Sequence, residues 1–319
     1  MSEVRGRTMR ERAEFAHRTF KNRVAQRDAT RLQQHETATA IGNVPSPPQV
    51  APQVSQSDTR RLTSVIEGSK HAPTATVHQA RLRIYQATRR PKMLDQLITT
   101  AWGRVRVIGA IGQAHEDVQE AITYVGREPS SSDDGRLSLL VDPAEVRRIA
   151  RQPSGTTFRR VLDGLMQTVI EIVEPVHLAC LGHLIDHIDY RPKRLDGSDI
   201  VVPNRLGGER FLWRIEFGKA LCRMIDADMW LHWDPSAIAS LRHGISQAIV
   251  RHVRSHKTVP NGGWTLDGLI IAVAGELSDQ GMRDRRRELC GPKGDLEALR
   301  HLGVLIESGR VLRVEQKPG

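Results

Sequence analysis

Residues 266–314 read LDGLIIAVAGELSDQGMRDRRRELCGPKGDLEALRHLGVLIESGRVLRV, and this pattern predicts two short helices close together. The first helix covers 266–274, where leucine, isoleucine and valine recur at helical spacing until a glycine ends the run. Ser278 and Asp279 follow, and either can cap the start of a second helix over 279–290. That second helix is rich in arginine. Two helices joined by so tight a turn are typical of a helix-turn-helix.

A β-hairpin completes this unit. Glycine and proline at 291–294 are expected to stop the arginine-rich helix, and a separate helix is predicted from Asp295 to Leu302. Beyond it, apolar runs on either side of Ser308-Gly309 predict two antiparallel strands. A hairpin after the second helix is a wing, so the sequence predicts a winged helix-turn-helix.

The arginine-rich helix has two faces. Met282 and Leu289 lie seven positions apart and must share the inward face, with Cys290 beside them. Arg286 falls near the inward edge. The remaining candidate contacts are Ser278 at the cap and, on the outward face and its edges, Gln280, Arg283, Asp284, Arg285 and Arg287. Such a face is either a solvated charge cluster or a surface that enters a groove of DNA.

The placement of these charges favours DNA. The outward face of the second helix is the side that a helix-turn-helix presents to the major groove. Arginine pairs bidentately with guanine, and glutamine at 280 can read adenine in the same way. Arg310 and Arg313, in the predicted wing, are expected to contact phosphates.

A helix is predicted in front of this unit. Asp234 is its expected N-cap and Pro235 its first residue, because the missing N–H of proline costs nothing there. Its apolar stripe comprises Ile238, Leu241, Ile245, Ile249 and Val253.

A similar order of elements occurs earlier in the chain. Val105 and Val107 indicate a strand, and the spacing of Val118, Ile122 and Val125 indicates a helix. A strand is predicted over 137–141, followed by a short helix ending near Ala150.

Cap residues and apolar spacing define the rest of this earlier unit. Asp142 is the N-cap of the short helix, Pro143 its first residue and Glu145 the partner in a capping box. A second helix is capped between Ser154 and Thr157, with inward residues Phe158, Val161, Leu162 and Leu165. Its outward face and edges carry Thr156, Thr157, Arg159 and Arg160. Residues 168–173 and 181–191 are expected to form the paired strands of a first wing.

The predicted fold class is α+β, with two tandem winged helix-turn-helix domains behind a disordered N-terminal segment. Residues 1–75 are basic and then rich in proline, serine and glutamine, which predicts disorder and a linker. The first domain is placed at 76–205 and the second, expected to read sequence, at 206–319.

Composition narrows the partner. The chain has 319 residues and a formal net charge of +10, which favours an anionic partner. No run of 18 apolar residues occurs and the N-terminus has no apolar export segment, so no membrane is expected and a cytoplasmic location is predicted. Aromatic residues make up 4%, too few for a binder that stacks single-stranded bases on rings. Duplex DNA is the expected partner.

Catalytic signals are poor. The chain lacks a GxxxxGK[ST] phosphate loop, and its three cysteines form no CxxC pair. Two histidine pairs at i, i+4 occur, His183 with His187 and His252 with His256, but neither has a third ligand nearby in sequence. The second pair is expected to interact favourably with a helix C-terminus. The sequence predicts a protein that is not an enzyme and takes no cofactor or metal.

The segment from Leu231 to Ile306 resembles the C-terminal winged helix of plasmid replication initiators, particularly TrfA-type initiators and their IncQ RepC-like relatives. The matching segments are Ala237 to His256, Leu266 to Ala274, Asp279 to Cys290 and Leu302 to Ile306. The likeness extends diffusely over residues 95–319.

The resemblance implies a bacterial, plasmid-associated protein that binds repeated sequences, the iterons, at a plasmid origin. It implies help in opening the origin, recruitment of the host initiator and replicative helicase, and copy-number control by a homodimer formed through the first winged helix. Groove-facing positions carried over are Gln280, Arg283, Asp284 and Arg287, with Thr156, Arg159 and Arg160 in the first domain.

Two other functions fit parts of the sequence. A dimeric transcriptional repressor of the plasmid operon would bind an inverted repeat, but such repressors usually need only one winged helix per chain. A metal-dependent nuclease would use the histidines and aspartates at 183–189.

Overall fold

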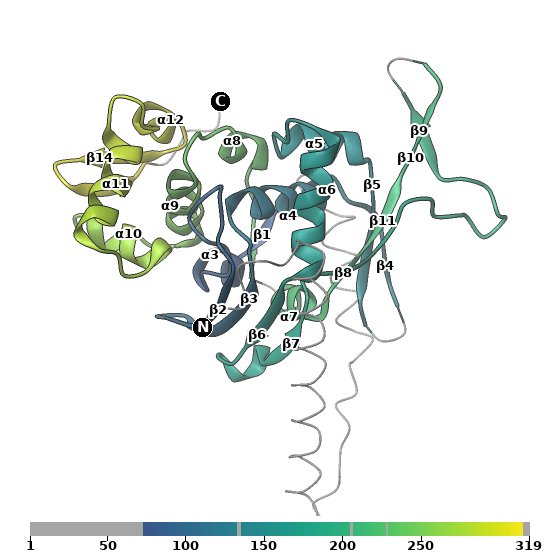
Figure 1. Ribbon diagram of the computed structural model, residues 1–319, viewed down its shortest axis with the longest axis horizontal. Coiled ribbons are helices and arrows are strands. Elements are labelled where there is room, and N and C mark those ends of the chain that lie inside the picture. Colours follow the sequence, from purple (N-terminus) through teal and green to yellow (C-terminus); the bar gives the residue numbers. More distant parts are fainter. Residues whose placement is uncertain (1–72, 133–134, 205–206, 228, 315–319) are drawn as a thin grey trace, which may run out of the picture. The chain divides into compact units, whose positions relative to one another are not determined.

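The computed structural model describes residues 73–132, 135–204, 207–227 and 229–314, which form a mixed α+β fold (Figure 1). The predicted N-terminal segment, up to residue 72, lies outside the described residues. Two large hydrophobic cores organise the described chain. We call the elements around them the first and the second module.

The first module contains four helices and a four-stranded sheet. Helix α4 packs against both α5 and α6. The sheet order is β4-β5-β11-β8, and every neighbouring pair is antiparallel. The helices are α4 (Gln113–Val125), α5 (Pro143–Ile149), α6 (Gly155–Gln167) and α7 (Lys219–Asp226); the strands are β4 (Arg127–Ser131), β5 (Leu137–Val141), β8 (Ile185–Asp189) and β11 (Trp213–Phe217).

A second sheet, in the order β2-β3-β6-β7, covers the same core. Its strands are β2 (Leu94–Thr100), β3 (Gly103–Gly109), β6 (Val169–Ile172) and β7 (Cys180–Gly182), and the 3-10 helix η1 (Val176–Leu178) precedes β7. The prediction that 168–173 pairs with 181–191 holds only for the start of the second segment. Leu181 and Gly182 pair with β6, whereas β8 pairs with β11. The chain therefore leaves one sheet and enters the other between Gly182 and Ile185.

The elements that follow β8 extend the first module past residue 205, where its end was expected. β9 (Val201–Pro203) and β10 (Glu209–Phe211) form a hairpin, and β11 then returns to the centre of the sheet. Ala220, Leu221 and Met224 of α7 are buried in the first core. Sequence reasoning missed these elements, although WRIEF at 213–217 alternates apolar and polar residues as a half-buried strand does.

The second module contains the C-terminal helices and a three-stranded sheet in the order β13-β15-β14. Residues near the start of the described chain join it, because β1 pairs with β12 and α3 packs against α9. Its helices are α3 (Val77–Arg81), α8 (Pro235–Ala239), α9 (Gly244–Ser255), α10 (Leu266–Ala274), α11 (Asp279–Cys290) and α12 (Leu296–His301); its strands are β1 (Ala75–Thr76), β12 (Trp230–Leu231), β13 (Trp264–Thr265), β14 (Val304–Glu307) and β15 (Arg310–Arg313).

Most local predictions for the helices are confirmed. α10 and α11 have the expected bounds, and the Ser278 side chain, rather than that of Asp279, caps α11 by accepting from the Gly281 N–H. Asp142 and Ser154 cap α5 and α6. The capping box expected between Asp142 and Glu145 does not form. The Glu145 carboxylate lies near two arginines instead, Arg127 and Arg148.

The single helix expected from Ala237 to His256 is broken into α8 and α9. The Asp295 carboxylate, which precedes α12, accepts the backbone N–H groups of Arg242 and His243 at 3.1 and 2.8 Å. The Arg89 guanidinium donates to the carbonyl of Leu241 at 2.9 Å. Backbone groups at the break therefore have side-chain partners from distant parts of the chain, which makes the break stable.

The two modules repeat one order of elements. A helix (α4 or α9) packs on the two helices that follow it, and a strand (β5 or β13) precedes those two helices. Two strands follow, and the later one (β11 or β15) lies between the other two in the sheet. The modules differ in the elements that interrupt this order. The first module adds β4 before β5, then β6, η1 and β7 after α6, and β9 and β10 before β11, whereas the second adds only α12 after α11.

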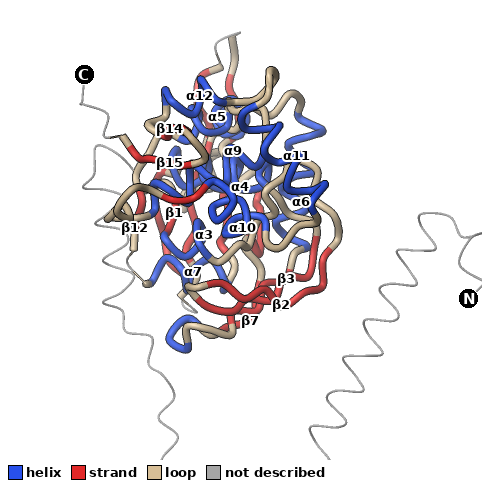
Figure 2. The backbone as a smooth tube through the Cα atoms, turned by 90° about the vertical axis from the view of Figure 1, so that its left-hand side faces the viewer, coloured by secondary structure: helices blue, strands red, loops and turns tan. Residues whose placement is uncertain are grey.

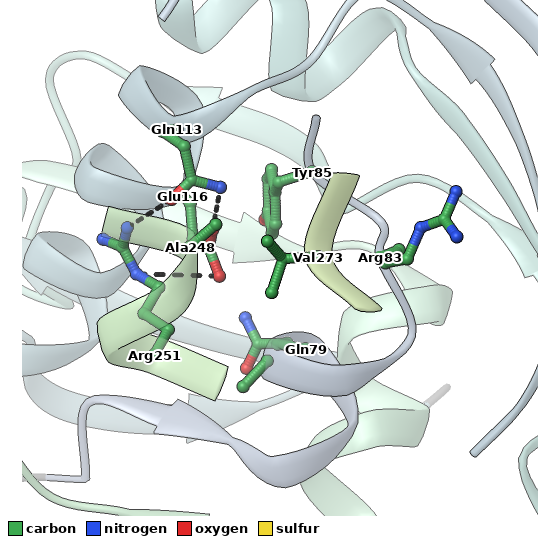
Figure 3. Close-up of a pocket in the computed structure, with 9 residues that line it drawn as sticks. Gln79, Arg83, Tyr85, Gln113, Glu116, Ala248, Arg251 and Val273 are labelled. Atoms are coloured by element: carbon green, nitrogen blue, oxygen red, sulfur yellow. Dashed lines mark hydrogen bonds and ion pairs between the residues drawn. The ribbon is translucent and has the colours of Figure 1, made fainter. Parts of the chain in front are cut away.

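One buried arginine joins the modules. Arg251 of α9 is 1% exposed, and its side chain bonds residues of α4. Helix α4 lies beside α9 (Figure 1, Figure 2). Its guanidinium donates to both carboxylate oxygens of Glu120 and to Asp117, each at 2.8 Å, and to the Gln113 amide oxygen at 2.7 Å. Glu116 lies 3.7 Å away (Figure 3). Every acceptor is on α4, so the network fixes α9 against the first module.

The three carboxylates differ from ordinary surface acids. Burial raises the pKa of Asp117 and Glu120, and it raises the pKa of Glu116 to about 8. The Gln113 amide donates to Glu116 at 2.8 Å. At neutral pH Glu116 is therefore largely protonated, whereas Asp117 and Glu120 accept the hydrogen bonds of the Arg251 guanidinium. The partly buried Arg89 lies 3.7 Å from Asp117.

Replacing Arg251 with Met should lower the free energy of unfolding by about 3–5 kcal/mol, because two buried carboxylates lose their charge partner. Urea unfolding measures the change. Arg300→Met, at an exposed position of α12, is the control and should stay within about 0.5 kcal/mol of the wild type. A loss below about 1 kcal/mol in Arg251→Met would contradict a structural role for the network.

Glu116 should make stability fall as pH rises. Its folded-state pKa of about 8 exceeds the ordinary 4.5, so its stabilising contribution is present below pH 4.5 and is lost as pH rises to 8. Between these values each pH unit removes up to about 1.4 kcal/mol. Glu116→Gln should make this slope shallower, while the raised pKa values of Asp117 and Glu120 keep a residual slope, and urea unfolding from pH 5 to 9 measures the change. Glu307→Gln, at an exposed position of β14, should parallel the wild type throughout.

Candidate nucleic-acid interface

Helix α11 packs against the second core with one side and is exposed on the other. Leu289 is completely buried in the second core and Met282 packs against that core. The Ser278 hydroxyl accepts from the Gly281 N–H at 3.2 Å, and the C-terminal end stops at Gly291 as expected. Cys290, expected beside the inward residues, is exposed instead.

The outward side of α11 carries a connected polar array. Gln280, Arg283 and Arg287 are exposed and Asp284 is half-buried. Arg283 donates to the Gln280 amide oxygen at 3.0 Å, and the Gln280 amide donates to Asp284 at 2.9 Å. Asp284 also pairs with Arg287 at 3.2 Å. Because a guanidinium has five N–H donors, both arginines keep donors for another partner.

The other two arginines of the helix are occupied differently. Arg285 is half-buried and donates to Glu288 of the same helix at 2.6 Å. Arg286 pairs with Asp267 of α10 through two nitrogens, one of them at 2.8 Å from the carboxylate. This pair links α11 to α10, but Arg286 is exposed, whereas it was expected near the inward edge.

The two arginines of the predicted wing, now found in β15, have different environments. Arg310, at the start of β15, is exposed next to the Ser308-Gly309 turn. Arg313 is half-buried, and its guanidinium donates to the backbone carbonyls of His256 and Lys257 beyond α9. Arg310 is therefore available to phosphate, whereas Arg313 has a structural contact.

Helix α6 presents the corresponding face in the first module. Thr156, Arg159 and Arg160 are exposed, opposite the buried Phe158, Val161, Leu162 and Leu165. Thr157 is half-buried, and its hydroxyl lies 3.0 Å from that of the cap residue Ser154. Arg159 lies 5.8 Å from the centre of the Tyr190 ring, just after β8. These residues share one surface, which is separate from that of α11 because the two helices belong to different cores.

Three further arginines lie on and just after α5 and were not among the expected contacts. Arg147, Arg148 and Arg151 are exposed, whereas Val146 and Ile149 of the same helix are buried. The helical spacing of those two apolar residues was the signal that could have placed the arginines outside.

Two side chains beside α11 were also missed. His243 and Lys293 line a shallow pocket with Arg287, and the His243 ring lies 3.0 Å from the Lys293 carbonyl. Only the tertiary contact between the start of α9 and the loop after α11 brings them together.

The histidine pairs do not build a metal site. Within the described ranges, no group of three or more histidine, cysteine, aspartate or glutamate side chains could hold a metal ion. His183 bonds the Thr168 carbonyl at 3.0 Å, and His187 is exposed. Burial lowers the pKa of both His252 and His256 to about 4, so these rings are neutral at pH 7. The expected favourable interaction of a cationic histidine with the end of α9 is therefore wrong.

Comparisons with known proteins found no relative from which a function could be inferred. The chain matches no family model, no curated protein and no solved structure. Among the described residues, no helix is long and apolar enough to cross a membrane.

The two arginines of β15 should respond differently to substitution. Arg310→Ala should reduce the slope of log affinity for duplex DNA against log salt by about 0.9 and leave unfolding unchanged. Arg313→Ala should lower the free energy of unfolding by about 1–2 kcal/mol, because two carbonyls lose a charged donor. Fluorescence anisotropy over a salt series and urea unfolding provide the two measurements. The opposite pattern would reverse the two assignments.

Proposed function

We propose that both modules are winged helix-turn-helix units and that the protein is a plasmid replication initiator that binds repeated duplex sequences at an origin. In this proposal α6 and α11 are the recognition helices, and the strand pairs β8–β11 and β14–β15 are the wings. The protein acts by binding and by recruiting the host initiator and helicase, without catalysis of its own.

The observation that carries the proposal is the outward face of α11. Gln280, Arg283 and Arg287 stand exposed on a helix whose opposite side is fixed by Leu289. Arginine and glutamine are the side chains that pair bidentately with guanine and adenine in the major groove. Asp284 orients Gln280 and Arg287 before DNA arrives, which reduces the side-chain entropy lost on binding.

The repeated order of elements supports two DNA contacts from one chain. Each module has a capped helix after a tight turn, an apolar inward face and exposed arginines outward. Because the Arg251 network fixes α9 against α4, the two recognition helices keep a constant separation. A single chain can then read two successive segments of one direct repeat, the arrangement that the resemblance to initiators implies.

Charge supports the same partner. The formal net charge of +10 favours association with a polyanion, and phosphate contacts make such binding strongly dependent on salt. Arg147 and Arg148 lie on α5, the helix before α6, and Arg151 lies just after it, where a helix-turn-helix crosses the DNA backbone.

Selection from a random duplex library should yield a preferred sequence, and Arg283→Ala with Arg287→Ala should relax that preference. Loss of each bidentate pair is expected to reduce discrimination by about 1–3 kcal/mol. The double variant should unfold like the wild type, because both side chains are exposed. A replicon lacking its initiator, supplied with this gene and its adjacent repeats, should be maintained by the wild type and lost with the double variant.

Each result separates the proposal from its alternatives. Arg300→Ala, an exposed arginine of α12, is the matched control and should maintain the replicon. Preferred binding to an inverted repeat by a stable dimer, with no maintenance, would indicate a repressor. Cleavage of supercoiled plasmid that depends on divalent metal would indicate a nuclease. Maintenance that survives the double variant would show that α11 is not the reading helix.

A further inference from the structure

The chain between β8 and β11 forms an anchored arm on the first module. The arm comprises residues 190–204 and 207–212 and includes the hairpin β9–β10, which projects from the sheet in Figure 1. Ile200 and Leu212 are buried with Leu140 of β5 in a small hydrophobic cluster of their own. Arg210 pairs with Asp142, the cap residue of α5. The arm therefore has its own contacts with the module and a fixed direction.

One branch of the arm ends in a tight turn with a leucine at its tip. Lys193 pairs with Asp199 across the branch, and the Arg194 N–H donates to the Ser198 carbonyl at 2.9 Å. The Asp196 carboxylate accepts the backbone N–H of Ser198 at 2.9 Å. These bonds hold the turn in one shape, and Leu195 at its tip is fully exposed.

The root of the arm adjoins the outward face of α6. The Tyr190 ring meets the Trp213 ring edge-to-face, with the two ring centres 4.9 Å apart. Trp213 in turn stacks on the buried Phe158 of α6, with their ring centres 5.9 Å apart. Arg159 of α6 lies 5.8 Å from the Tyr190 ring. The arm thus begins beside the residues that are proposed to face the major groove.

The reach of this branch fits DNA. Leu195 lies five positions after Tyr190, and an extended chain of that length spans up to roughly 16–18 Å. One turn of B-DNA rises about 34 Å, so the neighbouring minor groove lies about 17 Å from a helix in the major groove. With α6 in the major groove, the branch is therefore long enough to reach the next minor groove.

We propose that Leu195 inserts between base pairs from the minor groove and partly unstacks them, with Arg194 beside it at the groove edge. This inference rests on the proposed function and adds to it a means of distorting the origin. Proteins that bend DNA use apolar side chains in this way, and the resulting kink lies where stacking is lost. An initiator that must open duplex DNA gains a point of weakness next to its own binding site.

The composition of the tip favours this ligand over a protein surface. Among residues 191–199, Leu195 is the one exposed large apolar side chain, because Pro192 is buried and the remaining residues are charged, glycine or serine. Protein-binding sites expose contiguous apolar patches, whereas a wedge needs a single apolar side chain. Three cations and two carboxylates lie in this segment, and both carboxylates already have partners, Lys193 and Ser198.

Base unstacking tests the inference directly. The selected duplex, with 2-aminopurine placed at each step in turn, should brighten on binding at one step about half a turn from the bases that α6 protects. Leu195→Ala should abolish that signal and weaken binding about tenfold, while the selected sequence stays the same. Leu195→Met should keep the signal, because methionine can also act as a wedge.

Control variants separate the possible outcomes. Val176→Ala removes another highly exposed apolar side chain from the same module and should behave as the wild type. If the 2-aminopurine signal is unchanged in Leu195→Ala, the inference is overturned and the proposed function stands. The same conclusion follows if Leu195→Ala loses helicase recruitment but still unstacks the bases. A wild-type chain that selects no duplex would overturn the proposed function and this inference with it.

Discussion

Arg251 is the residue on which the arrangement of the two modules depends. It comes from α9 of the second module, and its partners Gln113, Asp117 and Glu120 all lie on α4 of the first. In a protein interior, a charge of this kind is tolerated only with nearly complete pairing, because water no longer screens or solvates it. The network therefore selects one docking of α9 on α4.

Polar side chains from distant segments also decide where helices end. The Asp295 carboxylate bonds the backbone at the start of α9, and Arg89 bonds the carbonyl of Leu241 just before it. Asp295 itself follows the loop after α11. The break between α8 and α9 is thus connected to the position of α11, so the helix that presents Arg283 and Arg287 is supported both by its apolar face and by the loop behind it.

The arginines of the chain divide into two groups with different physical roles. Arg251, Arg286 and Arg313 donate hydrogen bonds to carboxylates or carbonyls of neighbouring elements. Arg160, Arg283 and Arg310 remain exposed, and they lie where the proposed recognition helices and wing meet solvent. A positive net charge alone does not distinguish these groups, because the distinction depends on which element packs beside each side chain.

Local sequence was sufficient for much of the secondary structure. The bounds of α10 and α11, the caps Asp142, Ser154 and Ser278, and the buried faces of α6 and α10 follow from cap chemistry and helical spacing, which act within a few residues. The outward positions of Gln280 and Arg283 follow for the same reason.

Tertiary contacts decided the rest. The split of residues 181–191 between two sheets, the return of β11 to the centre of the first sheet and the pairing of Arg251 with α4 all join residues far apart in the chain. No local pattern encodes such partners, because strand pairing and buried ion pairs are selected by the packing of the whole core. Periodicity thus fixed which side of a helix faces inward, and only packing determined what that side meets.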